Sequence, residues 1–535
     1  MGTMWKVIGF LPLCLLAIFP LTASAQQDFE IVKGGCLPDV VNDDGEEALV
    51  RGAQPQRLPA LYTDWNPEKT YHQMVILIEF SDSVFSMEDP AAFYNKILNE
   101  PGYNEGNGLG CAADYLRSQS GGLANFHFDV FGPVRVGQKA QPYSDPNSNT
   151  KNYPRDSYAE ATQKVLQDNP NLDYSIYDWN GNGNINQVVY ITASLSGNTG
   201  SKSYGFPWPH TSTLNATITT PDGLKIRQYS ASAELLPTTP FRSCGIGTIC
   251  HEFSHSLGLP DIYPTKSSGG YSVCDEWDLM DGGNFTNYGW CPSNYSAMER
   301  MLLGWLTPVE LTEPASITNL EPVEYGGNAY IIRHTDTEFL MLENRQWKGW
   351  DLGVPGKGLV IYHVNYNSSV WTNNSLNNDP TQRGFDLVHA DNMNYVEWDN
   401  YRSKMGYSKY QNSNRMNSRI LSTSPYPWRT DSAEAALDSL TDFSVPATVM
   451  FTANTQDSKL LSKPITNIKV SENGLVSFDF MGGVPKPDGI KLHHSSSIAT
   501  HPSIYDLQGR NMNLQNRKGV YLIRREDGTV RKIFK

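Results

Sequence analysis

Short hydrophobic runs divide the first half of the chain into strands and helices. Met74–Phe80 (MVILIEF) and Gln187–Ala193 (QVVYITA) are apolar at almost every position, which is typical of strands buried on both faces. Phe126–Val130 (FHFDV) alternates apolar and polar residues, as a half-buried strand does. Ser157–Gln167 has helical spacing, and a second helical run covers Ser296–Leu306. Strands interleaved with helices predict an α/β domain.

After Pro308 the pattern changes to short β runs separated by Gly, Asn and Asp turns. These runs predict a β-sandwich-like domain, and they read AYIIRH, EFLMLENRQ, GLVIYHVNY, FDLVHAD, ATVMFTA and LVSFDFM. Gly482–Ser503 is rich in Pro, Ser and His, which favours a linker. The remaining C-terminal residues hold two or three strands, too small a piece for a stable core of its own.

The N-terminus has the pattern of a secretory signal peptide. Lys6 precedes an apolar run over Val7–Phe19, and Ala23, Ser24 and Ala25 form a small-x-small cleavage site. An uncleaved anchor is the alternative, but the run is short against the roughly 20 residues that a membrane span needs. The expected organisation is a signal peptide at 1–25, a pro-segment at 26–68, a catalytic domain at 69–313, the β-sandwich-like domain at 314–483, and a linker with a small β tail at 484–535.

Length and charge narrow the class of protein. A chain of 535 residues with 39% hydrophobic content is too long for a single core and can build a deep active site. Its net charge of -14 argues against nucleic acid or an anionic membrane as the main partner, because both attract basic surfaces. Beyond the signal peptide, no stretch is long enough to span a bilayer.

Six cysteines remain once Cys14 leaves with the signal peptide, and four of them surround one polar helical segment. An exported protein can oxidise such thiols, although six cysteines allow fifteen pairings. Disulfides that brace this segment and buried free thiols are equally open alternatives. The six are Cys36, Cys111, Cys244, Cys250, Cys274 and Cys291.

That segment, Thr248–Asp261 (TICHEFSHSLGLPD), predicts a zinc site. On a helix, His251 and His255 share one face and can present their imidazoles to one ion at about 2.0 to 2.1 Å, while Glu252 lies beside the metal without binding it. Gly258 can end the helix in a left-handed conformation, and the returning chain would bring Asp261 to the metal as third ligand. The fourth position stays open for water, as in catalytic zinc sites.

The same residues resemble a known family. HEFSHSLGLPD has the form H-E-x-x-H-x-x-G-x-x-D, a variant of the metzincin signature with aspartate in the third ligand position. GIGTICHEFSHSLGLPDIY, WDLMDGG and NYSAMERMLLGWL closely resemble the immune inhibitor A family of secreted metallopeptidases. The resemblance extends through DYSIYDWNGNGNINQVVYI, WPH, ENRQWKGWD and WTNNSLNNDP, so it covers most of residues 70–483.

This resemblance implies a metzincin-like catalytic domain and a secreted or surface-bound bacterial zinc endopeptidase acting on proteins or peptides. Glu252 would be the general base, and Met280 occupies the place of the methionine that metzincins carry beneath the zinc. The chain departs from the metzincin pattern at Gly282, where many metzincins have a tyrosine. Tyr263 and Tyr295 are weak candidates for its role.

Three weaker features complete the sequence-based expectations. Asp178, Asn180 and Asn182 follow the first half of an EF-hand loop, but Val189 stands at the twelfth position, so calcium and a plain Asn-Gly turn remain alternatives. The C-terminal YDLQGR and KGVYLIRREDGTVRKIFK resemble the sorting tails of Por-type (type IX) secretion, which implies contact with export machinery; a β-hairpin is the simpler reading.

The third feature is GGCLPD in the pro-segment, where Cys36 or Asp39 could block the zinc, with a disulfide from Cys36 to Cys111 as the simpler reading. Two rival functions also stand: a surface adhesin whose peptidase domain is a relic, and a zinc hydrolase of non-peptide amides. The intact Glu252 argues against the relic, because a relic needs no base.

Overall fold

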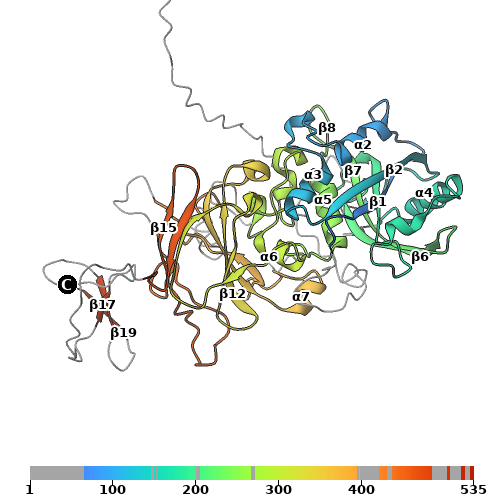
Figure 1. Cartoon of the computed structure of the whole chain (residues 1–535). Helices are drawn as coiled ribbons and strands as arrows, with labels where there is room; N and C mark the ends of the chain where they lie inside the picture. The colour runs from blue at the N-terminus through green and yellow to red at the C-terminus, as the bar shows by residue number, and fades with distance from the viewer. Residues whose placement is uncertain are drawn as a thin grey trace, which may run out of the picture.

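The computed structural model describes residues 65–145, 150–151, 153–199, 205–266, 272–394, 397, 421–429 and 437–484, together with three short strands in the C-terminal segment. Figure 1 shows an α/β half, coloured blue to green, beside a mainly β half, coloured yellow to orange. The mixed α/β class expected from the sequence is confirmed. The metzincin-like arrangement and the β-sandwich remain predictions.

A six-stranded sheet forms the centre of the α/β half, in the order β2-β1-β5-β7-β6 with β8 paired to β7. Its first four strands run parallel, and β6 is antiparallel at one edge. All three strands predicted in this half are confirmed, as β1, β2 and β5. The bounds are β1 Thr70–Glu79, β2 Asn125–Arg135, β5 Val188–Leu195, β6 His210–Thr219, β7 Lys225–Leu236 and β8 Arg242–Ser243.

Helices cover both faces of this sheet because its central strands are apolar on both sides. On β1, Val75 and Leu77 join a core with helices α2, α3 and α5, whereas Met74 and Ile76 join a second core with α4. The alternation places the HExxH helix, α5, on one defined face. The helices are α2 Pro90–Asn99, α3 Ala112–Gln119, α4 Arg155–Asp168, α5 Gly247–Ser256, α6 Ala297–Leu302 and α7 Ser368–Thr372.

Two further sheets build the β half. One has the order β14-β13-β12-β11-β9 and the other β10-β16-β15. Side chains from both sheets form one shared hydrophobic cluster. The bounds are β9 Val309–Glu310, β10 Ala315–Leu320, β11 Tyr330–Arg333, β12 Glu338–Arg345, β13 Gly358–Asn365, β14 Phe385–Leu387, β15 Ile465–Val470 and β16 Val476–Phe480.

Strand β12 is buried along its whole length because its two faces serve different cores. Phe339 and Met341 pack in the core that contains α5, whereas Leu340 and Leu342 pack in the cluster shared by the two β sheets. The five-stranded sheet therefore lies between the HExxH helix and the rest of the β half. Segments beyond residue 313 are part of the surroundings of that helix.

One predicted strand is wrong. ATVMFTA, residues 447–453, makes only isolated bridges, and Val449 is 56% exposed. The backbone N–H groups of Phe451 and Thr452 donate to the carboxylate of Glu338 at 2.6 and 2.9 Å, which takes them from a β ladder. The second predicted helix is shorter than expected, since α6 ends at Leu302 and the chain turns through Gly304 at φ +69°.

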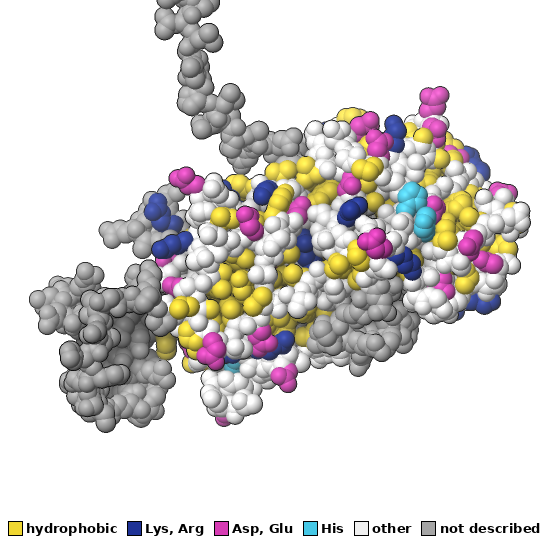
Figure 2. Space-filling model, viewed as in Figure 1, with side chains coloured by type: hydrophobic (Ala, Val, Ile, Leu, Met, Phe, Trp, Pro, Cys, Tyr) yellow, Lys and Arg dark blue, Asp and Glu magenta, His cyan; other side chains and the backbone are white. Residues whose placement is uncertain are grey.

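Short elements connect the layers. They are β3 Ser144–Asp145, β4 Thr150–Lys151 and the 3-10 helices Glu105–Asn107, Tyr174–Tyr177, Asp275–Trp277, Gly283–Gly289, Val323–Tyr325 and Gly349–Gly353. On the face shown in Figure 2, acidic and basic side chains are interspersed among hydrophobic ones.

The signal peptide, the pro-segment up to residue 64 with its Cys36 and Asp39, and the linker from 485 to 502 lie outside the described residues. In the tail, β17 Ser503–Tyr505, β18 Val520–Arg524 and β19 Val530–Phe534 form a small antiparallel sheet, which agrees with the expected two or three strands. Within the described part of the chain, every helix is too short or too polar to cross a membrane.

Candidate metal centre

Helix α5 carries the HExxH segment and depends on glycine at both ends. A Cβ atom on Gly247 would lie 1.9 Å from the carbonyl oxygen of Asn284, so only glycine lets the first turn approach the segment 283–289. Gly258 follows the helix at φ +104° and donates its N–H to the carbonyl of His255 at 2.9 Å. The expected glycine turn thus ends the helix and returns the chain toward its histidines.

Both histidines are oriented by the backbone. His251 donates from Nδ1 to the carbonyl of Leu279 at 2.8 Å, and His255 donates from Nδ1 to the carbonyl of Leu259 at 2.8 Å. This bonding fixes the tautomer in which Nε2 is the atom that can bind a metal. Both imidazoles are buried, so their orientation is set by packing as well as by these bonds.

Asp261 faces both rings from the returning chain. Its Oδ1 lies 3.2 Å from Nε2 of His251 and 3.1 Å from Nε2 of His255. Ligand atoms about 2.1 Å from a tetrahedral zinc ion are about 3.4 Å apart, so these spacings are close to those of one metal's ligand set. The three side chains predicted as ligands are therefore brought together, and their donor atoms fit zinc.

The charges at this point suit a cation. Burial lowers the pKa of His251, but the hydrogen bond to Asp261 and the charges of Glu252 and Asp261 outweigh it and raise that pKa to about 9. Burial raises the pKa of Asp261, yet the charges and hydrogen bonds of the two histidines hold it well below its usual range. Two carboxylates thus favour positive charge between the imidazoles.

Glu252 belongs to the same buried group. One ligand atom from each of His251, Glu252 and His255 can be chosen so that all three lie within 4.8 Å of one another. The hydroxyl of Thr211, on edge strand β6, lies 2.7 Å from the Glu252 carbonyl oxygen and 3.1 Å from its Oε2, and donates toward both. The carboxylate is thus held beside the histidines from the sheet side.

The turn at residues 277–280 contacts both the helix that carries the histidines and the loop that carries Asp261. The carbonyl of Leu279 accepts from the ring of His251, and the next carbonyl, of Met280, accepts the N–H of Ile262 at 2.8 Å. Ile262 directly follows Asp261, so consecutive carbonyls of one turn bind both sides of the ligand set. The Met280 side chain is fully buried in the core beneath α5.

Comparison with known proteins matches the sequence that contains this centre to a family. Residues 61–304 match the profile described as immune inhibitor A peptidase M6, catalytic domain. The chain is similar to pre-pro-metalloprotease PrtV of Vibrio cholerae serotype O1, with 25% identity over 271 residues, which is 46% of this chain and 29% of that protein. It is also similar to immune inhibitor A of Bacillus thuringiensis subsp. alesti, with 24% identity over 265 residues, 42% of this chain and 38% of that protein.

Residues 61–304 form an M6 peptidase domain of the immune inhibitor A family. The family expected from the HExxH motif and its flanks is thereby confirmed. The chain spans less than two fifths of the length of the curated relatives it matches.

Two residues that contact the functional groups of the M6 domain were missed by sequence reasoning. Thr211 directly follows the WPH motif, and Asn374 lies in the WTNNSLNNDP segment, so both stood in stretches where the resemblance was visible. Asn374 donates from Nδ2 to Oδ2 of Asp261 at 2.6 Å. No spacing pattern in the sequence predicts that these two residues contact the motif, because the tertiary fold brings them to it.

The EF-hand-like loop precedes β5 in the M6 domain. Asp178 accepts the N–H of Asn182 at 3.1 Å and of Gly183 at 2.7 Å, and Asn180 also accepts from Asn182 at 3.3 Å. Val189, at the twelfth position, is buried in β5 and offers no oxygen from its side chain. These hydrogen bonds close the loop, and the choice between calcium binding and a plain Asn-Gly turn stays a prediction.

The tyrosine candidates and the cysteines take structural places. Tyr295 is fully buried, and its hydroxyl is hydrogen-bonded to that of Ser254, which packs it against the core side of α5. Tyr263 is partly buried. The five cysteines in the described part of the chain are buried free thiols, which decides against the crosslinks for these residues; they are Cys111, Cys244, Cys250, Cys274 and Cys291.

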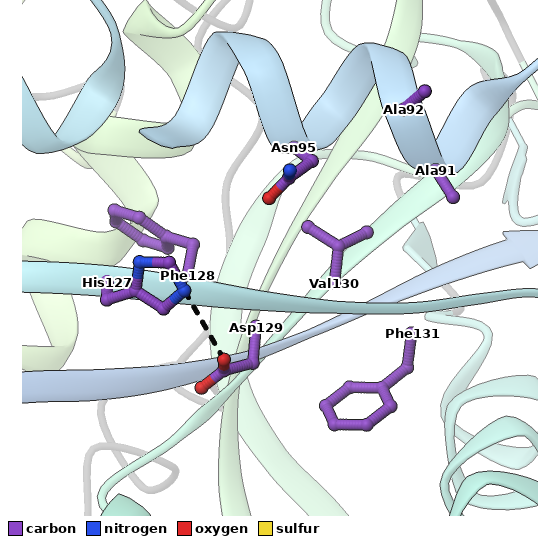
Figure 3. A pocket seen from close by; sticks show the side chains of 8 residues that line it. All are labelled: Ala91, Ala92, Asn95, His127, Phe128, Asp129, Val130 and Phe131. Atoms are coloured by element: carbon purple, nitrogen blue, oxygen red, sulfur yellow. Dashed lines mark ion pairs between the residues drawn. The ribbon is translucent and has the colours of Figure 1, made fainter. Parts of the chain in front are cut away.

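A second histidine group lies on the sheet surface, away from α5. His72 and His127 face each other on the paired strands β1 and β2, and both contact Asp129, at 2.8 and 3.5 Å. Figure 3 shows His127 and Asp129 along a pocket between β2 and α2. Phe126 and Phe128 alternate with them and point into the core of α5, so this group is separate from the candidate metal centre.

Proposed function

We propose that this protein is a zinc-dependent endopeptidase that acts on protein or peptide substrates. The observation that carries the proposal is that Oδ1 of Asp261 lies 3.2 Å from Nε2 of His251 and 3.1 Å from Nε2 of His255, with Glu252 beside them. Membership of residues 61–304 in a peptidase family supports the same reaction.

In this proposal His251, His255 and Asp261 hold the zinc ion. When bound, zinc supplies a Lewis acid that polarises the scissile carbonyl and acidifies a water molecule. Glu252 is the general base: its carboxylate takes the proton of the attacking water and later delivers it to the leaving amine. Thr211 keeps that carboxylate in place through its hydrogen bond to Oε2.

The burial of the centre strengthens the electrostatic interactions within it. Each of the four functional side chains is at most 7% exposed. Water screens buried charges much less than charges on the surface, so the Glu252 carboxylate interacts strongly with the charges of the ligands. Burial alone would favour the neutral form of both histidines. The nearby carboxylates make the site favourable for a cation.

The remaining sequence-based assignments belong to this proposal. A chain that begins with a signal peptide at 1–25 and a pro-segment at 26–68 suits an exported peptidase that stays inactive until it has left the cell. The catalytic domain at 69–313, the β-sandwich-like domain at 314–483, and a C-terminal tail at 484–535 that addresses export machinery complete it. A calcium ion at Asp178, Asn180 and Asn182 would be structural.

The test is metal content and peptide cleavage in the same preparation. The purified protein should carry about one zinc per chain, lose caseinolytic activity to a chelator and regain it when zinc is added. Mass spectrometry of a digested peptide library would then define the cleavage preference. A protein that binds zinc but leaves every peptide intact while hydrolysing small amides would contradict the endopeptidase assignment.

A further inference from the structure

The third ligand of the candidate centre is held by a residue from the β half. Asn374 follows helix α7, is 4% exposed, and has a left-handed backbone at φ +51°. Its Nδ2 donates to Oδ2 of Asp261 at 2.6 Å, and its Oδ1 accepts the backbone N–H of Asp261 at 2.7 Å. One amide group thus binds both the carboxylate and the backbone of the same residue.

This double contact determines how Asp261 faces the histidines. With Oδ2 bonded to Asn374, the other oxygen, Oδ1, is the one that lies 3.1 to 3.2 Å from the two imidazoles. The backbone bond fixes the position of the carboxylate, and the side-chain bond fixes its rotation. The arrangement presents a single oxygen to the metal, as a tetrahedral site requires.

The neighbours of Asn374 hold the rest of the returning loop. Asn377 donates to the carbonyl of Ile262 at 2.7 Å, and Asn378 accepts the N–H of Lys266 at 2.9 Å. Thr265 donates from its hydroxyl to the carbonyl of Asn374 at 2.7 Å. The segment 374–378 therefore contacts the loop 261–266 along most of its length.

We infer that Asn374 is a positioning residue for the third zinc ligand, and that segment 374–378 of the β half completes the metal centre. The inference rests on the proposed function. It extends that function because Asn374 lies 70 residues beyond residue 304, where the match to the M6 catalytic domain ends. Residues 61–304 alone would hold both histidines but leave Asp261 without its orienting partner.

The hydrogen bond from Asn374 to Asp261 should also affect how strongly the metal is bound. Outer partners of metal ligands typically change metal affinity by 10- to 100-fold when they are removed. Without Asn374, Asp261 loses the two hydrogen bonds that fix the position and rotation of its carboxylate. Loss of Asn374 should therefore weaken zinc binding and alter the ligand geometry together.

Two variants of the full chain test this. Asn374→Gly removes both hydrogen bonds and tolerates the positive φ, whereas Asn374→Asp keeps the acceptor for the Asp261 N–H and replaces the donor by a repelling carboxylate. The matched control is Asn373→Gly, since Asn373 is the exposed neighbour whose only hydrogen bond from its side-chain amide within the described structure goes to Ser369. Zinc affinity is measured by competition with a chromophoric chelator, and ligand geometry by the visible absorption of the Co²⁺-loaded protein.

We expect zinc affinity 10- to 100-fold lower in Asn374→Gly, a changed Co²⁺ spectrum in both Asn374 variants, and wild-type values for both measurements in Asn373→Gly. If Asn374→Gly fails to fold, Asn374→Asp decides. A merely structural role would lower the unfolding temperature of the metal-free protein and leave affinity and spectrum unchanged, which would overturn the inference. A wild-type protein that binds no zinc would instead overturn the proposed function.

Discussion

Two buried histidines in different halves of the protein have opposite acid–base behaviour. His251, in the candidate metal centre, has its pKa raised to about 9 because Asp261 and Glu252 outweigh the effect of burial. Burial lowers the pKa of His389, at the end of the five-stranded sheet, to about 3. His389 shares a hydrogen bond with the hydroxyl of Ser424 at 2.9 Å, and Asp391 is 4.0 Å away.

The difference shows which neighbour allows a buried histidine to take part in a cation site. Burial alone favours the neutral ring, as at His389. At His251 a carboxylate oxygen lies at 3.2 Å from Nε2 and provides a place for positive charge, whether proton or metal ion. A polar partner is enough to satisfy a buried imidazole, but only a close carboxylate makes it part of a cation-binding centre.

The largest expected effect breaks catalysis without touching either histidine. Glu252→Gln should lower kcat by roughly 10²- to 10⁴-fold, because the amide cannot take a proton from water. Its zinc content should match the wild type, since Glu252 is the base and not a ligand. The comparison variant is His389→Gln, which should keep peptidase activity at pH 7. Full activity in Glu252→Gln would contradict the mechanism.

Removal of the Asp261 carboxylate should leave His251 in surroundings like those of His389, with a much weaker preference for a cation. Asp261→Ala should lower zinc affinity by more than the roughly 100-fold that outer partners contribute, because it deletes a ligand. His251→Ala should do the same. Metal analysis of both proteins after dialysis against a weak chelator measures this. Unchanged zinc in Asp261→Ala would mean that the aspartate only flanks the helix.

The dependence of stability on acidic pH tests the lowered pKa of His389. The folded pKa of His389, about 3, lies below the unfolded value of 6.5, so between these values only the unfolded chain takes up the proton. The free energy of unfolding should fall as pH drops through this window, by up to about 1.4 kcal/mol per pH unit.

Urea unfolding at pH 7 and pH 5 measures this loss. His389→Gln lacks the titrating ring, so it should lose up to about 2 kcal/mol less than the wild type between these two pH values. Equal losses in both proteins would show that His389 is not the residue responsible.

The smallest expected effect concerns the hydroxyl partners. Thr211→Val preserves the shape of the side chain but removes the donor to Glu252, so kcat should fall roughly tenfold with zinc content unchanged. Ser424→Ala removes the hydroxyl partner of His389 and should leave kcat at pH 7 as it is. Steady-state kinetics of both variants gives the contrast. An equal decrease in both would point to a general effect on stability.

Sequence reasoning was successful where one local pattern carries the information. The buried runs that became β1 and β5 are apolar because both faces are covered, and α4 has the spacing of one apolar face. It failed at residues 447–453, where a short β run between turn residues suggested a strand but Glu338 binds the backbone N–H groups. It also left the disulfide question open, because the pairing of cysteines depends on their distances in the fold.

By itself, the sequence determined the helix with His251 and His255 and the glycine that ends it, because these depend on spacings within about ten residues. It also indicated the family, through motifs spread over most of residues 70–483. Only the tertiary structure decided which groups hold the centre in position. Leu279 reaches His251, Thr211 reaches Glu252 and Asn374 reaches Asp261 across 28, 41 and 113 positions of the chain. Such contacts form when sheets and helices pack, and no periodicity along the chain encodes them.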